Sequence, residues 1–265
     1  MAMLTALKGG FSEFRRGVTF RPIWIALAQE DITDQHRLTL LGPVWLVANY
    51  LAFVGTFVFV FNHSSASAPD YTVYVSVGLF VWLYLMEVMT QSPALFAREE
   101  SFIKGTTLPL AVYVMRLTMQ SVIRAGYALI GCLAIILISG ATPSWAWLWS
   151  ALALLFIVAV TPAVVTIFAF TGTFFPDSQY IIGNALKIGM FLTPVFWKYD
   201  NSGGLQHAFY YWNPFTYFLD IVRIPMLTGS FPIQAFLITL AIGALAWLLA
   251  LFMLGAYRKQ LVFML

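Results

Sequence analysis

Four charged residues lie inside otherwise apolar stretches of the sequence: Glu87, Arg116, Arg124 and Lys187. A charge in the hydrocarbon of a membrane is costly, so such residues pair with one another or line a polar path. Glu87 can pair with Arg116 or with Arg124 and hold two helices together. Alternatively, some of the four face a wet path, and Arg116 can also reach the membrane surface by extending its long side chain.

Aromatic side chains gather in a second place, the stretch YYWNPFTYFLDIVR at 210–223. Asp220 and Arg223 stand three residues apart, so on a helix they are neighbours that can satisfy each other. The ring faces of tyrosine and tryptophan are platforms for sugars, and their polar tips add hydrogen bonds. An aromatic belt at the membrane surface is the alternative interpretation.

Catalytic and metal-binding patterns are missing from the sequence. His36, His63 and His207 are scattered, with no HExxH motif and no Cys/His metal spacing. No nucleophile elbow or P-loop occurs. Cys132 lies in an apolar run, where a lone cysteine is a small buried hydrophobe. We therefore predict no enzyme, no metal site, and no cofactor bound by this chain.

The elements that position these residues follow from composition. The 265 residues are 61% hydrophobic and 9% charged, whereas soluble domains carry about 25% charged residues. The bilayer must therefore solvate most of the chain, and helices rather than barrel strands are expected. We predict an all-α membrane protein, one transmembrane domain over 1–265, with spans at 39–61, 71–90, 110–139, 145–175, 181–197 and 231–257.

Lysine and arginine in the loops set the predicted orientation. They concentrate in the N-terminal segment 1–37, in the loop after the second span, and in the tail 258–265. Both termini are therefore expected in the cytoplasm, with the 198–230 segment on the outer side. Arg15, Arg16 and Arg21 are expected to contact anionic lipid headgroups.

Two cytoplasmic elements are candidates for docking a partner. Residues 20–37 are predicted to form a helix on the membrane, with Pro22 in its first turn. The loop 96–109 mixes charges with apolar anchors and is expected to form a short helix ending near Gly105. A solvated linker and a solvated turn are the respective alternatives.

The outer segment is too polar to span the membrane and too apolar to be an ordinary loop. Pro194 is expected to end the fifth span, and Gly203 with Gly204 supplies a flexible turn. Asn213-Pro214 separates two predicted short helices that dip back into the outer leaflet. Such breaks are tolerated where they are buried in protein or line a wet cavity.

Two motifs carry a family resemblance. The stretch LLGPVWLVANYLAFVGTFVFVFN at 40–62 resembles the Leu-Gly-Pro-X-Trp opening of the first span in permeases of type-2 ABC exporters. GMFLTPVFW followed by YYWNPFTYFLDIVR resembles their later signature. The resemblance runs from about residue 21 to the end of the chain, and the nearest subgroup exports polysaccharides: O-antigen, capsule and teichoic acid.

The resemblance implies a homodimer of six-span subunits joined to two copies of a separate ATPase, which would bind ATP and magnesium. The lead-in helix and the loop after the second span would contact that ATPase, through Trp24, Gln29, Phe96, Glu99, Glu100, Phe102 and Lys104. The pair of re-entrant helices would lie at the outer mouth. Where many relatives have Phe-Pro-Arg-Glu before the third span, this chain has Leu-Pro-Leu-Ala at 108–111.

The predicted function is export of a lipid-linked polysaccharide such as O-antigen across the bacterial inner membrane, with membrane lipid as a partner and no nucleic acid. The outer gate of the channel is assigned to Trp197, Tyr199, Tyr210, Tyr211, Trp212, Tyr217, Asp220 and Arg223. Two alternatives remain open: a permease for a drug or small lipid, and, from another class, a membrane-embedded glycosyltransferase or acyltransferase.

Overall fold

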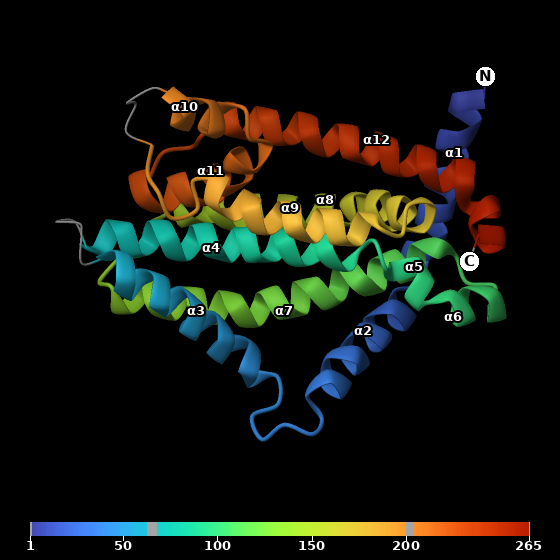
Figure 1. The fold of residues 1–265 in the computed structure, drawn as a ribbon, viewed down its shortest axis with the longest axis horizontal. Helices are drawn as coiled ribbons and strands as arrows, with labels where there is room; N and C mark the ends of the chain where they lie inside the picture. The colour runs from blue at the N-terminus through green and yellow to red at the C-terminus, as the bar shows by residue number, and fades with distance from the viewer. Residues whose placement is uncertain (1, 63–67, 200–203, 265) are drawn as a thin grey trace.

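The structure, a computed structural model, describes residues 2–62, 68–199 and 204–264. These ranges contain twelve helices and no strand (Figure 1). The helices are α1 Ala2–Thr19, α2 Arg21–His36, α3 Val44–Asn62, α4 Ala68–Gln91, α5 Leu95–Arg98, α6 Glu100–Gly105, α7 Leu110–Ile138, α8 Trp147–Phe174, α9 Ser178–Leu192, α10 Gly204–Tyr211, α11 Pro214–Thr228 and α12 Ile233–Met264. His63 and Gly203, both singled out in the sequence, lie outside the described residues.

Among the described residues, four helices are long and apolar enough to cross a membrane: α4, α7, α8 and α12. They coincide with four of the predicted spans. The predicted spans 39–61 and 181–197 fall on α3, a shorter apolar helix, and on α9, which has 15 residues. At 1.5 Å per residue, α9 reaches about 22 Å, less than the ~30 Å hydrocarbon core.

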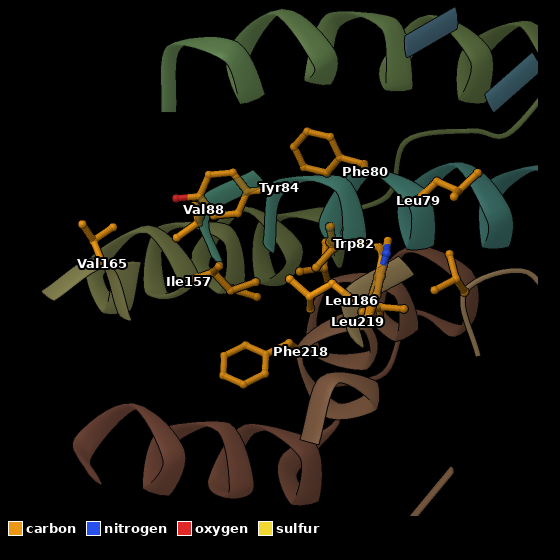
Figure 2. Packing of buried hydrophobic residues seen from close by; sticks show 14 of the residues in the cluster. Leu79, Phe80, Trp82, Tyr84, Val88, Ile157, Val165, Leu186, Phe218 and Leu219 are labelled. Atoms are coloured by element: carbon orange, nitrogen blue, oxygen red, sulfur yellow. The ribbon is translucent and has the colours of Figure 1, made fainter. Parts of the chain in front are cut away.

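Helix α4 is the central element of the bundle. Its residues from Tyr71 to Trp82 are all buried, and it packs against α3, α7, α8, α9 and α11. Trp82 meets Phe215 of α11 edge to face, with ring centroids 5.3 Å apart. Ile157 of α8, Leu186 of α9 and Phe218 of α11 complete the core around it (Figure 2).

The two ends of the bundle carry different short elements. Both termini lie at one end together with α5 and α6, and α10 and α11 lie at the other (Figure 1). The short elements follow the sequence predictions: Pro22 stands in the first turn of α2, α6 ends at Gly105, and α9 ends two residues before Pro194. Helix α1 was not predicted.

Candidate functional site

A cluster of charges lies at the end of the bundle that holds the termini. Arg116, two turns into α7, grips Asp31 of α2 with two parallel bonds: Nε to Oδ2 and Nη2 to Oδ1, both 2.7 Å. Its Nη1 donates to Glu99 Oε2 at 2.8 Å. Such bidentate, charge-assisted contacts are strong and geometrically specific. Arg116 therefore joins the lead-in helix, the α5–α6 junction and α7.

A second pair lies two turns further along α7. Arg124 Nη1 donates to Glu87 Oε1 of α4 at 2.6 Å, and its Nη2 donates to Gln35 Oε1 of α2 at 3.0 Å. Of the two partners open to Glu87 in the sequence, the structure selects Arg124. Gln120, between the two arginines, donates to Asp31, so the cluster is continuous from α2 to α4.

Around these charges lies a polar pocket of about 650 Å³. It is lined by Asp31, Asp34, Gln35, Glu87, Gln91, Arg98, Glu99, Arg116, Gln120 and Arg124. Four carboxylates face three guanidinium groups, so the opposite charges nearly balance. This balance indicates that the cluster holds the helices together by ion pairs and does not bind an anion.

Part of the predicted partner-docking loop is buried in the helical bundle. Phe96 is fully buried and meets Phe170 of α8 at 5.2 Å between ring centroids. Glu99 is buried in its ion pair with Arg116. Within this chain these two residues anchor the loop to the bundle, and their contact with an ATPase stays a prediction.

The exposed members of the predicted docking set lie on or near α6 and α2. Phe102 is 57% exposed, and Glu100 and Lys104 form an exposed i,i+4 ion pair at 2.6 Å. Gln29 is exposed on α2, whereas Trp24 is half-buried. Four of the seven predicted contact residues thus remain available on this surface.

At the opposite end, Asp220 and Arg223 form the pair that their spacing predicts. Arg223 Nη2 donates to Asp220 Oδ1 at 2.9 Å, and Nη1 donates to the Pro194 carbonyl at 2.8 Å. The guanidinium carbon lies 3.8 Å from the ring centroid of Tyr74, a cation–π contact. The single proton of the Tyr74 hydroxyl is shared between the Trp197 carbonyl at 2.7 Å and the Pro194 carbonyl at 3.1 Å.

Asn213 explains the break between the two short helices. Its Oδ1 accepts the Phe215 N–H at 2.9 Å, which caps α11. Its Nδ2 donates to Thr193 Oγ1 at 2.7 Å. Pro214 occupies the first position of α11, where a missing N–H costs nothing. One Asn-Pro dipeptide thus starts α11 and ties it to the end of α9.

Tyrosine rings cover this buried pair. The Tyr210 hydroxyl donates to Asp220 Oδ2 at 2.8 Å, and burial together with the nearby carboxylate raises the pKa of Tyr210 well above its usual value. Tyr210 therefore stays protonated and keeps donating. Tyr199 stacks on Tyr210 with centroids 5.0 Å apart, and Tyr211 meets both rings edge to face.

A pocket of about 480 Å³ opens beside these rings. It is lined by Asp70, Tyr74, Lys198, Tyr199, Tyr210, Tyr211, Asp220, Arg223, Ile224, Leu227 and Thr228. Tyr74 and Lys198 are members that the sequence did not single out. The pocket combines ring faces with hydroxyl, ammonium and carboxylate groups, which is chemistry suited to a polyhydroxylated ligand.

The remaining predicted gate residues, Trp197, Trp212 and Tyr217, are not part of this pocket's lining. Trp212 is 86% exposed. The Tyr217 hydroxyl donates to the Tyr211 carbonyl at 2.8 Å, and the Trp197 indole N–H donates to the Phe191 carbonyl at 3.1 Å. Trp197 and Tyr217 therefore hold backbone segments in place, and Trp212 presents its ring to the surroundings.

Lys187 and the N-terminal arginines are exposed. Lys187 lies on the outer face of α9, and no ion pair involves it within the described part of the chain. Arg15 and Arg16 are exposed on α1, and Arg21 is exposed at the start of α2.

Two carboxylates escaped the sequence analysis as ion-pair members. Asp31 lies in the predicted lead-in helix, and neither Asp31 nor Glu13 was expected to form an ion pair. Their acidic type was visible, but their partners Arg116 and Arg258 lie 85 and 245 positions away along the chain.

The long apolar helices, the internal charge cluster and the tyrosine-lined pocket define a polytopic helical membrane protein. Comparison with known families gives the next step. Residues 23–227 match the family described as ABC-2 type transporter, and the chain belongs to this family. Its members are transport subunits.

Curated relatives of the chain are named as O-antigen export permeases. The chain is 26% identical over 179 residues to "O-antigen export system permease protein RfbA" of Klebsiella pneumoniae, covering 66% of this chain and 69% of the relative. It is 22% identical over 177 residues to a protein of the same name from Myxococcus xanthus, covering 66% and 68%. The family predicted from the two motifs is thereby confirmed, and the family match covers residues 23–227 rather than running to the end of the chain.

Proposed function

We propose that this chain is the transmembrane subunit of an ATP-driven exporter that moves a lipid-linked polysaccharide, such as O-antigen, across the bacterial inner membrane. Two copies would form the path, with six spans each, both termini in the cytoplasm, and two copies of a separate ATPase. The whole chain, 1–265, would be one permease domain. The names of the relatives support the substrate class.

The observation that carries the proposal is the tyrosine-lined pocket at the end opposite the termini. Its ring faces and its charged and hydroxyl groups come from α4, α10, α11 and the segment after α9. In the proposed orientation this end is the outer mouth, so α10 and α11 would be the re-entrant pair. A polymer that slides past needs many weak contacts, which ring faces offer.

Helix α9 supports the two-copy arrangement. Tyr180, Asn184 and Lys187 follow one stripe of its exposed face at helical spacing. An ammonium group is costly against lipid, and α9 is short for a span that faces lipid alone. We infer that this stripe lines a wet path that a second copy closes from the other side.

Reconstitution tests the proposal. The chain, co-purified with a candidate partner ATPase and placed in liposomes, should give faster ATP hydrolysis when lipid-linked polysaccharide is supplied, and the complex should move the polymer across the bilayer. An ATPase variant that binds but does not hydrolyse ATP is the control. Stimulation by drugs or simple lipids but not by the polysaccharide would overturn the assigned substrate.

A further inference from the structure

Helix α1 crosses α12 at very close range near the end of the bundle that holds both termini (Figure 1). A Cβ added at Gly10 would lie 1.9 Å from the Leu251 carbonyl oxygen, and one added at Gly255 would lie 1.8 Å from the Ala6 carbonyl oxygen. Only glycine allows the two backbones to approach this closely. The crossing point of α1 on α12 is therefore fixed.

A buried carboxylate fixes the rotation of α1 about its own axis. Glu13 is buried, and its Oε2 pairs with Arg258 Nη1 of α12 at 2.7 Å. Its Oε1 accepts the Leu110 N–H at 3.1 Å, which satisfies one of the orphan donors at the start of α7. The face of α1 that carries Glu13 therefore points into the protein.

A stripe on the side of α1 roughly opposite Glu13 is apolar and largely exposed. Leu4, Phe11 and Val18 repeat every seven residues, so they share one face of the helix. Leu4 is 65% exposed, Phe11 57% and Val18 38%. Within the described chain, Leu4 and Phe11 thus keep more than half of their surface exposed, and Val18 keeps over a third.

The direction of this stripe follows from the residue beside it. Phe14 packs edge to face on Trp247 of α12, with ring centroids 4.8 Å apart. Trp247 stands three turns before Arg258, so it lies deeper in the span than the charged end of α12. Phe11 is one turn from Phe14 on α1, and its stripe therefore points toward the bilayer side of the helix.

Basic residues border the stripe. Lys8 and Arg15 stand at i−3 and i+4 from Phe11, so both are its neighbours on the helix surface, and both are exposed. Arg16 lies about 140° around the helix from Phe11. An apolar stripe flanked by basic residues is the pattern of a helix that lies in the surface plane of an anionic membrane.

We propose that α1 is a lipid-docking helix specific for anionic phospholipid. Leu4, Phe11 and Val18 enter the acyl region of the adjoining leaflet, and Lys8 and Arg15 hold phospholipid phosphates beside them. The proposal requires only that the chain spans a membrane, and it stands whatever the exporter carries.

Spin labels measure the position of the stripe. Cys132 is the single, buried cysteine, so Cys132→Ala allows a nitroxide to be placed at Phe11→Cys or, one position on, at the exposed Ser12→Cys. In bilayer nanodiscs with the full chain, the label at 11 should relax with oxygen and the label at 12 with a water-soluble nickel chelate. A nickel response at both positions would overturn the proposal. So would protection of position 11 that arises only when the ATPase is added, because a protein would then cover the stripe.

Headgroup preference is measured with a fluorophore at position 11 and a quencher attached either to phosphatidylglycerol or to phosphatidylcholine. The phosphatidylglycerol quencher should be enriched, and Arg15→Gln should lower that enrichment by up to about fivefold for the one charge. Arg16→Gln is the matched control, because it removes the same charge from the opposite face. Equal quenching by the two lipids, or equal effects of the two variants, would overturn the anionic specificity.

Discussion

Removing Asp220 alone should destabilise the protein more than removing its whole ion pair. Within the described chain this is the most buried ion pair, with side chains 7% and 2% exposed. Arg223 also donates to the Pro194 carbonyl and lies over Tyr74. In Asp220→Ala the guanidinium keeps these two contacts and loses its only carboxylate partner.

The contacts set the expected magnitudes. Leaving one member of a buried pair without its partner costs about 3–5 kcal/mol. In the double variant Asp220→Ala/Arg223→Met no charge is left behind, and the Pro194 carbonyl still accepts from Tyr74 at 3.1 Å. The Tyr210 hydroxyl loses its acceptor at a cost of about 1–3 kcal/mol. We expect about 1–3 kcal/mol for the double variant.

The free energy of unfolding can be followed by titrating dodecyl sulfate into mixed micelles of the wild type, both single variants and the double variant. The exposed pair provides the control: Glu100→Ala should cost less than about 1 kcal/mol. If Asp220→Ala cost as little as Glu100→Ala, or if the double variant lost the sum of the two single losses, the reasoning about the buried pair would be refuted.

Three further predictions concern coupling and transport. Glu100→Ala with Phe102→Ala should uncouple ATP hydrolysis from export, since these are exposed members of the docking loop; unchanged coupling with normal insertion would argue against that contact. Arg116→Gln should leave Asp31 and Glu99 without their cationic partner and lower the free energy of opening α2 by about 3 kcal/mol. Amide hydrogen exchange would detect this as faster exchange in α2, and equal protection in the wild type and the variant would disprove it. Trp212→Ala should slow polymer export about 2–10-fold through loss of one ring contact, at unchanged protein level; an unaltered export rate would remove Trp212 from the path.

The positions where helices begin and break were predictable from the sequence because they depend on residues a few positions apart. Proline placed the start of α2 and the break after α9, and Asn213-Pro214 divided α10 from α11. The Asp220–Arg223 pair was predictable for the same reason, since residues three apart on a helix are always adjacent.

The packing of helix α1 and the burial of Phe96 in the loop after α4 could not be predicted from neighbouring residues. The stretch 2–19 is polar and basic, so composition identified a cytoplasmic segment but not a helix held by Gly10 and Gly255. Phe96 and Phe102 are the same residue type in one short loop, yet only the second is exposed. Which ring faces inward depends on where Phe170 lies, and no sequence pattern encodes that distance.

The sequence by itself determined the membrane environment, the helical class, the family and the places where the chain breaks, because each follows from composition or from residues a few positions apart. Only the tertiary structure decided which charges far apart in the sequence meet. Arg116 takes Asp31 and Glu99, and Arg124 takes Glu87, since helix packing sets which partners come within hydrogen-bond reach. The same packing gathered Tyr74, Lys198 and the tyrosines of α10 around one pocket, because long-range contacts exist only once the helices have docked.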